Sequence, residues 1–480
     1  MSKVPIIIWF RQDLRLNDNP ALHAAIETGQ PVIPLYILDD DNAKEWRMGA
    51  ASRVWLHHAL VNLNKDLSGK LIVKHGNASK VIPKLVQETG ANAVHWNRCY
   101  EPWRIARDKQ IKSDLEDKDI TVQSFNGLLL WEPWHIKTQA GTPYKVFTPF
   151  YRKGCLQQPA PRKPLPIPNM AYHKTDKLGC SVNDLNLLPT NEGAWHETLA
   201  SHWDISEQGA LDRLNDFLDD GLQHYKEGRD HPADNNTSRL SAYLHFGQIS
   251  PNTAWYAAQA RGTIEGWEND LGHFLSELGW REFSYSLLYH FPKITWDNFQ
   301  DKFDKFPWLE AESPDLDAWR KGMTGYPIID AGMRELWQTG YMHNRVRMIV
   351  GSFLVKNMLT HWHKGEQWFW DCLVDADLAS NSASWQWIAG CGADAAPYFR
   401  IFNPTLQSKK FDGAGEYIRQ YVPELKDLPD DLIHTPWEAT DMELKAANIE
   451  LDKDYPRPLM NHSTARDRAM EAYQSVRKEG

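Results

Sequence analysis

The sequence has few cysteines and no long apolar segment. Its 480 residues include five cysteines, with no CxxC pair: Cys99, Cys155, Cys180, Cys372 and Cys391. This odd, scattered set excludes a disulfide framework and is typical of a reducing compartment, which predicts a cytoplasmic protein. The first apolar run, from Val4 to Phe10, is too short to span a bilayer and precedes no signal-peptide cleavage pattern.

Several common catalytic motifs are also missing. No GxGxxG follows the first β-rich run, and no GxxxxGK[ST], GxSxG or HExxH occurs. The usual dinucleotide, P-loop, serine-hydrolase and zinc-protease interpretations therefore lack their key residues. His361 and His363 form a His-x-His pair, but without a third ligand we interpret them as structural rather than metal-binding.

Positive charge is scarce in the second part of the chain. Residues 1–200 hold 25 Lys and Arg against 20 Asp and Glu, whereas residues 201–480 hold 28 against 43, and the net charge is −10. So acidic a protein does not bind nucleic acid through its net charge and needs a local basic patch. Two acid-free stretches, 341–365 and 395–411, carry cations for such a patch. Helix or loop faces packed on acidic neighbours are the alternative.

Tryptophan is the abundant residue. The chain has 22 Trp against 17 Tyr and 17 Phe. Indole rings stack well on flat ligands, so a planar cofactor or a nucleobase is one explanation. A Trp-rich core is the other.

The first 125 residues alternate β-rich runs with segments of helical spacing. This rhythm predicts an α/β domain with a doubly wound parallel sheet. The expected strands are 5–10, 31–38, 70–75, 92–97 and 120–125, and the expected helices are 20–27, 51–67, 78–89 and 105–116.

Proline is frequent from 127 to 200, which predicts a linker on the surface. Strand signals almost vanish after about 205, which predicts a large all-α domain. The expected helices are 206–226, 252–260, 267–290, 327–339, 343–361, 365–374 and 463–477. We therefore expect an α/β domain over 1–130, a linker over 131–204 and a helical domain over 205–480.

Two segments group side chains that are poor core material. Glu277, Trp280 and Arg281 have i, i+3, i+4 spacing, which places an acid, a ring and a cation on one helix face. The segment 375–387 holds two carboxylates, an amide and two indoles. The alternatives are a mixture of surface and core residues in the first segment, and helix-capping aspartates in the second.

Two further segments carry groups suited to nucleotides. Asn344 and Met348 are i, i+4 neighbours, and they pair an amide that can read a base edge with a thioether that packs on flat surfaces. Arg345 beside them can hold a phosphate. The run 237–241, TSRLS, can offer hydroxyls, a guanidinium and backbone N–H groups to a diphosphate, although it also fits a helix N-cap.

Taken together, these segments resemble the DNA photolyase/cryptochrome family, and cyclobutane pyrimidine dimer (CPD) photolyases most closely. The similarity rests on the order and spacing of many short motifs along the whole chain. The matching segments are WFRQDLRL at 9–16, YKVFTPF at 144–150, TSRLS at 237–241, ELGWREF at 277–283, TGYPIID at 324–330, HNRVRM at 343–348, DADLASNSASWQW at 375–387 and YFRIFNP at 398–404.

The resemblance implies an N-terminal antenna domain and a helical domain that holds FAD. The residues implied for the FAD diphosphate are Tyr225, Thr237, Ser238, Arg239, Leu240 and Ser241. Asp375 and Asp377 are implied to contact the flavin and ribose side, with Arg347 paired to Asp375. Asn381 is implied to face the flavin N5. Plant cryptochromes bear Asp and many animal cryptochromes bear Cys at that position, so Asn381 favours repair over signalling.

The resemblance also implies a lesion pocket and light-driven repair of CPDs by electron transfer from excited reduced FAD to the flipped-out dimer. Glu277 is implied to hydrogen-bond the dimer, and Trp280 and Trp387 are implied to pack on either side of it. The residues implied to line the pocket and to contact the DNA backbone are Asn344, Arg345 and Met348. Arg281 is counted with this set, and Arg229 and Gln407 are implied to touch DNA. Trp385, Trp362 and Trp308 match the electron relay that reduces oxidised flavin.

Two other functions stay open: a cryptochrome-type blue-light sensor and a (6-4) photolyase. Tyr341 stands where many photolyases have Trp, and the SAS after Asn381 replaces a commoner NGG. The (6-4) enzymes have a second His where this chain has Asn344. A second chromophore, folate or deazaflavin, is expected beside FAD. The expected partner is DNA containing pyrimidine dimers, with no membrane, no obligate protein partner and a monomeric state.

Overall fold

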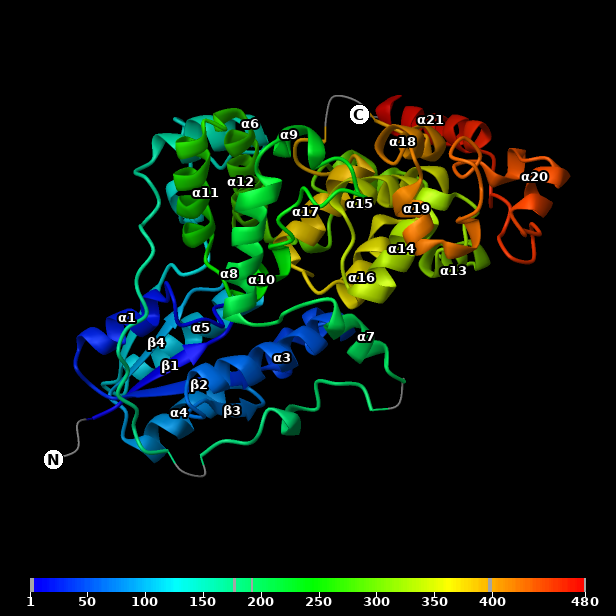
Figure 1. Ribbon diagram of the computed structural model, residues 1–480. Helices are drawn as coiled ribbons and strands as arrows, with labels where there is room; N and C mark the ends of the chain where they lie inside the picture. The colour runs from blue at the N-terminus through cyan, green and yellow to red at the C-terminus, as the bar shows by residue number, and fades with distance from the viewer. Residues whose placement is uncertain (1–3, 176–177, 191–192, 396–398, 479–480) are drawn as a thin grey trace. The chain divides into compact units, whose positions relative to one another are not determined.

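The computed structural model describes residues 4–175, 178–190, 193–395 and 399–478 (Figure 1). Tyr398 of the expected YFRIFNP motif lies outside them. The chain forms two compact units: Met1–Gln223 with Ser238–Pro292, and His224–Thr237 with Lys293–Gly480. The predicted limits of the antenna domain, linker and helical domain stay predictions. Among the described residues, no helix is long and apolar enough to cross a membrane.

The first unit contains one parallel sheet with strand order β3-β2-β1-β4-β5. The inner strands β1 and β2 are continuous buried apolar runs because a parallel sheet covered by helices is buried on both faces, whereas the edge strands β3 and β5 are partly exposed. One face packs Ile7 and Ile33 against Ile82 of helix α4 (Ala78–Thr89) and Ile111 of helix α5 (Pro102–Glu116). The strands are β1 (Ile6–Phe10), β2 (Val32–Leu38), β3 (Ile72–His75), β4 (Ala93–Asn97) and β5 (Thr121–Phe125). The predicted fold class is confirmed.

Some helices of this unit alternate with the strands along the chain, and others follow the last strand in the sequence. Those around the sheet are α1 (Pro20–Glu27), α2 (Asp40–Ala43), α3 (Ala50–Asp66), α4 (Ala78–Thr89) and α5 (Pro102–Glu116). The later ones are α6 (Phe147–Pro149), α7 (Trp195–Ser201), α8 (Glu207–Asp216), α10 (Ser241–Phe246), α11 (Pro251–Glu265) and α12 (Glu268–His290).

The expected irregular linker is partly structured. Residues 133–135 and 147–157 form short helical turns, and Phe150 is buried. The reason is aromatic packing, because the rings of Phe147 and Phe150 contact Phe283 of α12 at centroid distances of 6.0 and 5.1 Å. Proline content indicated a surface segment, but these side chains belong to the core beneath α12.

Gly247 closes α10 at a position that only glycine fits. Its φ is +71°, and a Cβ there would lie 2.0 Å from the carbonyl oxygen of Gln12. We expect Gly247→Ala to lower the free energy of unfolding by at least about 1–2 kcal/mol, the cost of the left-handed backbone alone. Thermal unfolding of the two proteins measures it. An unchanged melting temperature would contradict this account of the turn.

The second unit is helical and packs around one large apolar core. That core includes Trp319, Trp362, Trp385 and Phe369, so part of the tryptophan surplus is core material. Its helices are α9 (Tyr225–Gly228), α13 (Pro314–Lys321), α14 (Pro327–Thr339), α15 (Asn344–Ser352), α16 (Trp362–Cys372), α17 (Leu378–Ala389), α18 (Pro404–Phe411), α19 (Glu416–Tyr421), α20 (Asp441–Ala446) and α21 (His462–Lys478).

Two expected helices are interrupted. The segment expected over 206–226 passes from α8 into a π-helical turn at 217–221, and His224 has a φ of +66°. The segment expected over 343–361 passes from α15 into a π-helical turn at 353–357, and Leu359 has a φ of +56°. Residues in this conformation end a helix, and apolar periodicity alone does not reveal them.

Candidate functional site

Asn381 is held in place by the start of α17. The Asp377 side chain caps this helix by accepting a hydrogen bond from the Ser380 backbone N–H at 2.8 Å. One turn later, the buried Asn381 amide donates from Nδ2 to the carbonyl oxygen of Glu366 at 3.0 Å. This bond fixes the amide and leaves its Oδ1 and its second N–H for another partner. Asp377 therefore has the helix-capping role given above as the alternative, and the Asn381 amide is held in a fixed position.

Arg347 and Asp375 form a partly buried ion pair. The guanidinium Nη2 lies 3.1 and 2.8 Å from the two carboxylate oxygens, and Nε donates to the Met342 carbonyl at 2.7 Å. Burial works against the charged guanidinium, but Asp375 outweighs it and raises the pKa of Arg347. The pair is the one that the family resemblance implies.

The residues implied for the FAD diphosphate lie in both units. In the second unit, Tyr225 is buried at the start of α9, and the Arg229 guanidinium lies 5.4 Å from the centre of its ring. In the first, Ser238 Oγ accepts from the Leu240 N–H at 3.4 Å, and Arg239 adopts a φ of +50°. The N-cap residue of α10 is Leu240, which makes no side-chain capping hydrogen bond. Thr237 and Ser241 flank this turn.

Trp280 rests on an aromatic stack within the first unit. Its ring lies 3.8 Å from that of Phe147 at 11°, and Phe147 in turn stacks on Tyr151. One face of the indole is covered while the side chain is only half-buried. Glu277 lies one turn earlier on the same helix and is also half-buried. Together they offer a stacking surface beside a carboxylate.

Arg281 is turned toward its own unit. It donates from Nη1 to the Leu128 carbonyl at 2.8 Å, and its guanidinium lies 4.9 Å from the centre of the Tyr285 ring. Only 13% of its side chain is exposed. These contacts give it a structural role, whereas its role at DNA stays a prediction.

The cations of α15 have acidic partners. Asn344 is exposed at the first position of the helix, and Met348 is half-buried one turn on. Arg345 pairs with Asp230 at 2.7 Å and covers the Phe411 ring at 4.4 Å. A phosphate at Arg345 would therefore compete with Asp230. The alternative for this basic stretch was that its cations pack on acidic neighbours. Arg345 and Arg347 both do so.

The other residues implied for the lesion and DNA lie in the second unit. Trp387 is half-buried and packs against the core of this unit. Gln407 is half-buried on α18, whose last turn carries the exposed Lys409 and Lys410. No described contact tests their roles.

The three tryptophans of the expected relay are linked through α16. Trp385 packs so closely on the backbone at Gly365 that a Cβ there would lie 2.1 Å from its ring. Trp362, one turn earlier on α16, is fully buried. Trp308 contacts the ring of His361 at 5.6 Å, next to Trp362. Side chains of one helix and its neighbours thus join the three indoles.

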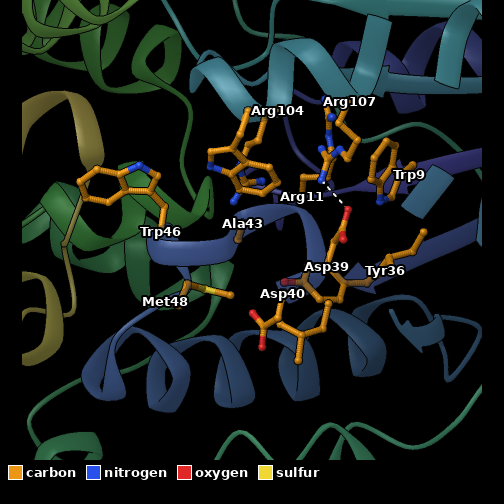
Figure 2. A pocket seen from close by; sticks show the side chains of 13 residues that line it. Trp9, Arg11, Tyr36, Asp39, Asp40, Ala43, Trp46, Met48, Arg104 and Arg107 are labelled. Carbon is orange, nitrogen blue, oxygen red and sulfur yellow. Dashed lines mark hydrogen bonds and ion pairs between the residues drawn. The ribbon is translucent and has the colours of Figure 1, made fainter. Parts of the chain in front are cut away.

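A pocket that no sequence pattern indicated lies at the carboxyl end of the sheet in the first unit. It is lined by Trp9, Arg11, Tyr36, Ile37, Leu38, Asp39, Asp40, Ala43, Trp46, Met48, Trp103, Arg104 and Arg107. Figure 2 shows Arg11, Arg104 and Arg107 on one side, with Asp39 and Asp40 across from them. The position of Arg11 directly after β1 was the available signal, since ligands of such sheets bind at this end.

Indoles and guanidinium groups alternate in this pocket. Arg107 lies 4.6 Å from the centre of the Trp9 ring and 5.0 Å from that of Trp103, and Arg104 lies 4.7 Å from that of Trp103. Such a wall suits a flat molecule, although the guanidinium groups of Arg11, Arg104 and Arg107 are already paired with carboxylates. Among the described residues, no group of three or more His, Cys, Asp or Glu could hold a metal ion.

Comparison with known proteins connects these observations. The family profile described as DNA photolyase matches residues 6–169, and that described as FAD binding domain of DNA photolyase matches residues 274–475. A deoxyribodipyrimidine photo-lyase of Agrobacterium fabrum is 49% identical, with 100% of this chain and 99% of that protein covered. Cryptochrome-2 of Arabidopsis thaliana is 38% identical, with 98% and 79% covered.

Solved structures agree with the sequence relatives. The crystal structure of a bacterial class III photolyase from Agrobacterium tumefaciens superposes with a TM-score of 0.95 at 48% identity, covering 100% of this chain and 98% of that one. A cryptochrome from Synechocystis gives a TM-score of 0.89 at 29% identity, covering 98% and 100%. Full-length similarity at this level, together with the FAD-binding profile, shows that this protein belongs to the DNA photolyase/cryptochrome family.

Proposed function

We propose that this protein is a deoxyribodipyrimidine photolyase that repairs cyclobutane pyrimidine dimers in DNA under blue light. The observation that carries the proposal is Trp280, whose ring has one face on Phe147 while Glu277 lies one helical turn away. A half-buried indole beside a carboxylate suits a flat base with polar edges. The full-length similarity to a protein named deoxyribodipyrimidine photo-lyase supports the same function.

The donor set of the second unit fits FAD. A flavin ring presents an N–H donor, carbonyl acceptors and the N5 atom. Asp375 can accept from the N–H, Arg347 can donate to a carbonyl, and Asn381 offers an amide to N5. When bound and reduced, FAD supplies the light-excited electron that opens the cyclobutane ring, and it recovers that electron afterwards. We assign the diphosphate to Tyr225 and Thr237–Ser241.

The protein side chains position the substrate. A damaged base pair is poorly stacked, so it leaves the duplex more easily than an intact pair. Trp280 and Trp387 offer indole faces to the flipped dimer, Glu277 offers a carboxylate to its imide edge, and Asn344 offers an amide. Both indoles also exclude water from the bases they cover. Arg229, Arg345 and Gln407 would contact the DNA strand.

Light-dependent repair tests this proposal. The purified protein, with its flavin reduced, is mixed with an oligonucleotide that carries one thymine cyclobutane dimer, and base absorbance is followed in blue light and in darkness. We expect absorbance to return only in light. If bound, reduced flavin gives no recovery, the proposal fails. The same assay on a (6-4) lesion then separates (6-4) repair from signalling, which the similarity to Cryptochrome-2 makes the second candidate.

We further propose that the pocket beside Arg11 and Trp103 holds an antenna chromophore of the folate or deazaflavin class. Trp103→Ala removes an indole that lies against Arg104 and Arg107. We expect this variant to lose the second chromophore and to keep FAD. Absorbance spectra of both purified proteins measure the two chromophores separately.

Trp195→Ala is the control for this variant, because it removes a half-buried indole of the same unit that does not line the pocket. Retention of the second chromophore by the Trp103 variant would contradict the assignment of the pocket. The monomeric state and cytoplasmic location stay predictions from the sequence.

A further inference from the structure

The ring of His363 lies directly against that of Trp362. Their centroids are 3.7 Å apart at an interplanar angle of 29°. Trp362 is fully buried, and its Nε1 donates to the amide oxygen of Asn298 at 2.9 Å. An amide oxygen does not accept a proton at neutral pH. An oxidised Trp362 would therefore keep its indole proton and carry a positive charge beside His363.

His363 is surrounded by groups that favour its protonated form. Its Nδ1 lies 2.9 Å from Glu366 Oε2 and its Nε2 lies 2.9 Å from the Trp296 carbonyl oxygen, so each ring nitrogen faces an oxygen acceptor. Burial lowers the pKa of His363, but the Glu366 carboxylate outweighs it and raises that pKa above the ordinary value. Glu310 acts in the same direction.

The other charged groups around this ring are accounted for. His361 stacks on His363 at 5.0 Å, and burial lowers the pKa of His361 to about 4, so it is neutral at physiological pH. Lys364 is paired with Glu312 at 2.8 Å. Burial raises the pKa of the facing Glu366 carboxyl. His363 is the ring next to Trp362 whose protonated form its surroundings favour.

Glu366, the partner of His363, also forms hydrogen bonds with residues of α17. Glu366 accepts a hydrogen bond from the Ser382 hydroxyl, and its backbone carbonyl accepts the bond from the Asn381 amide at 3.0 Å. The helix turn that carries His363 thus connects the middle tryptophan of the relay with the residue assigned to the flavin.

We propose that His363 is a positioning residue of the electron relay, whose charge sets how readily Trp362 gives up an electron and makes light-driven flavin reduction pH-dependent. The inference rests on the proposed relay. In that relay Trp385 would give one electron to the light-excited oxidised flavin, Trp362 one to Trp385 and Trp308 one to Trp362, and an external thiol returns one electron to Trp308. No proton leaves Trp362.

The sign of the effect follows from charge repulsion. An imidazolium at this distance disfavours positive charge on Trp362, so less of the separated charge reaches Trp308 before it recombines. Flavin photoreduction should therefore be weaker at acidic pH and should rise as pH passes through the pKa of His363. Two unit charges in contact inside a protein interact strongly enough to change the yield by about tenfold.

Two substitutions fix the charge at position 363. We expect His363→Gln, which is always neutral, to give a high and pH-independent photoreduction yield. We expect His363→Arg, which is always charged, to give a low and pH-independent yield. The yield per absorbed photon is measured with dithiothreitol as the thiol, across acidic and alkaline pH, on preparations with equal bound FAD. His23→Gln is the matched control, since His23 pairs with Glu27 on α1 in the other unit.

Glu366→Gln provides a readout that does not depend on flavin. Removing the carboxylate should lower the pKa of His363 measured by NMR titration of its imidazole, and the photoreduction midpoint should move by the same amount. Unchanged pH profiles in the Gln and Arg variants of His363 would overturn the inference. If Trp362→Phe photoreduces normally, the proposed relay itself has failed, so the two failures are distinguishable.

Discussion

Replacing Trp362 with Phe is expected to remove most of the light-driven reduction of oxidised flavin. Trp362 is fully buried. Trp308 contacts the ring of His361, the residue before Trp362 in the sequence, and Trp385 packs on Gly365, one turn later on α16. Phenylalanine is much harder to oxidise than tryptophan, so the middle step of the relay would be lost. The measurement is the rate at which bound oxidised flavin is bleached under blue light with an added thiol.

Repair itself should survive this substitution. Once the flavin has been reduced chemically, the relay has no further part in opening the dimer, so the Trp362→Phe protein should repair at the wild-type rate. Trp55→Phe is the control, because Trp55 is equally buried but lies in the first unit. Normal photoreduction by the Trp362 variant, or loss of repair by its pre-reduced form with FAD still bound, would show that the relay assignment is wrong.

The paired substitution of Glu277→Ala and Trp280→Ala should strongly reduce the preference for damaged DNA. The Trp280 ring is already held flat by Phe147 at 3.8 Å, so stacking a flipped base on it costs little further ordering. A base–aromatic stack contributes about 1–3 kcal/mol, so loss of this one should weaken dimer binding by about tenfold to a hundredfold. Binding to damaged and intact duplexes in darkness measures it.

The same helix offers a matched control. Trp267 and Glu268 lie at the N-terminal end of α12, and both are outside the assigned set. Trp267→Ala with Glu268→Ala should leave discrimination between damaged and intact DNA unchanged. FAD content should be normal in both double variants. If the Glu277 and Trp280 variant still discriminates like the wild type, these residues do not bind the lesion.

The sheet could be predicted from the sequence because its physical cause is local. Short β-rich runs alternate with helical segments, and the five expected strands match the observed ones within two residues at each end. The helical turns at 147–157 could not be found in this way. They are held by contacts with α12, such as that of Phe150 with Phe283, and sequence periodicity does not report contacts over such separations.

In the candidate site, too, local features could be predicted from the sequence, whereas contacts between distant residues could not. Spacing alone placed Glu277 and Trp280 on one face of a helix, and both lie on α12. The Phe147 ring that supports Trp280, and the Asp230 carboxylate that engages Arg345, are distant in sequence and required the structure. His363 illustrates the limit best, because its pattern suggested only a structural role, and its stacking on Trp362 became visible in the fold.

The central claim is that this chain is a repair enzyme, and turnover tests it most directly. Reduced protein is illuminated with blue light in the presence of a large excess of an oligonucleotide that carries one cyclobutane dimer, and the dimers removed per protein molecule are counted. The account predicts many dimers removed per molecule in light and none in darkness. No light-dependent removal, with FAD bound and reduced, would contradict it.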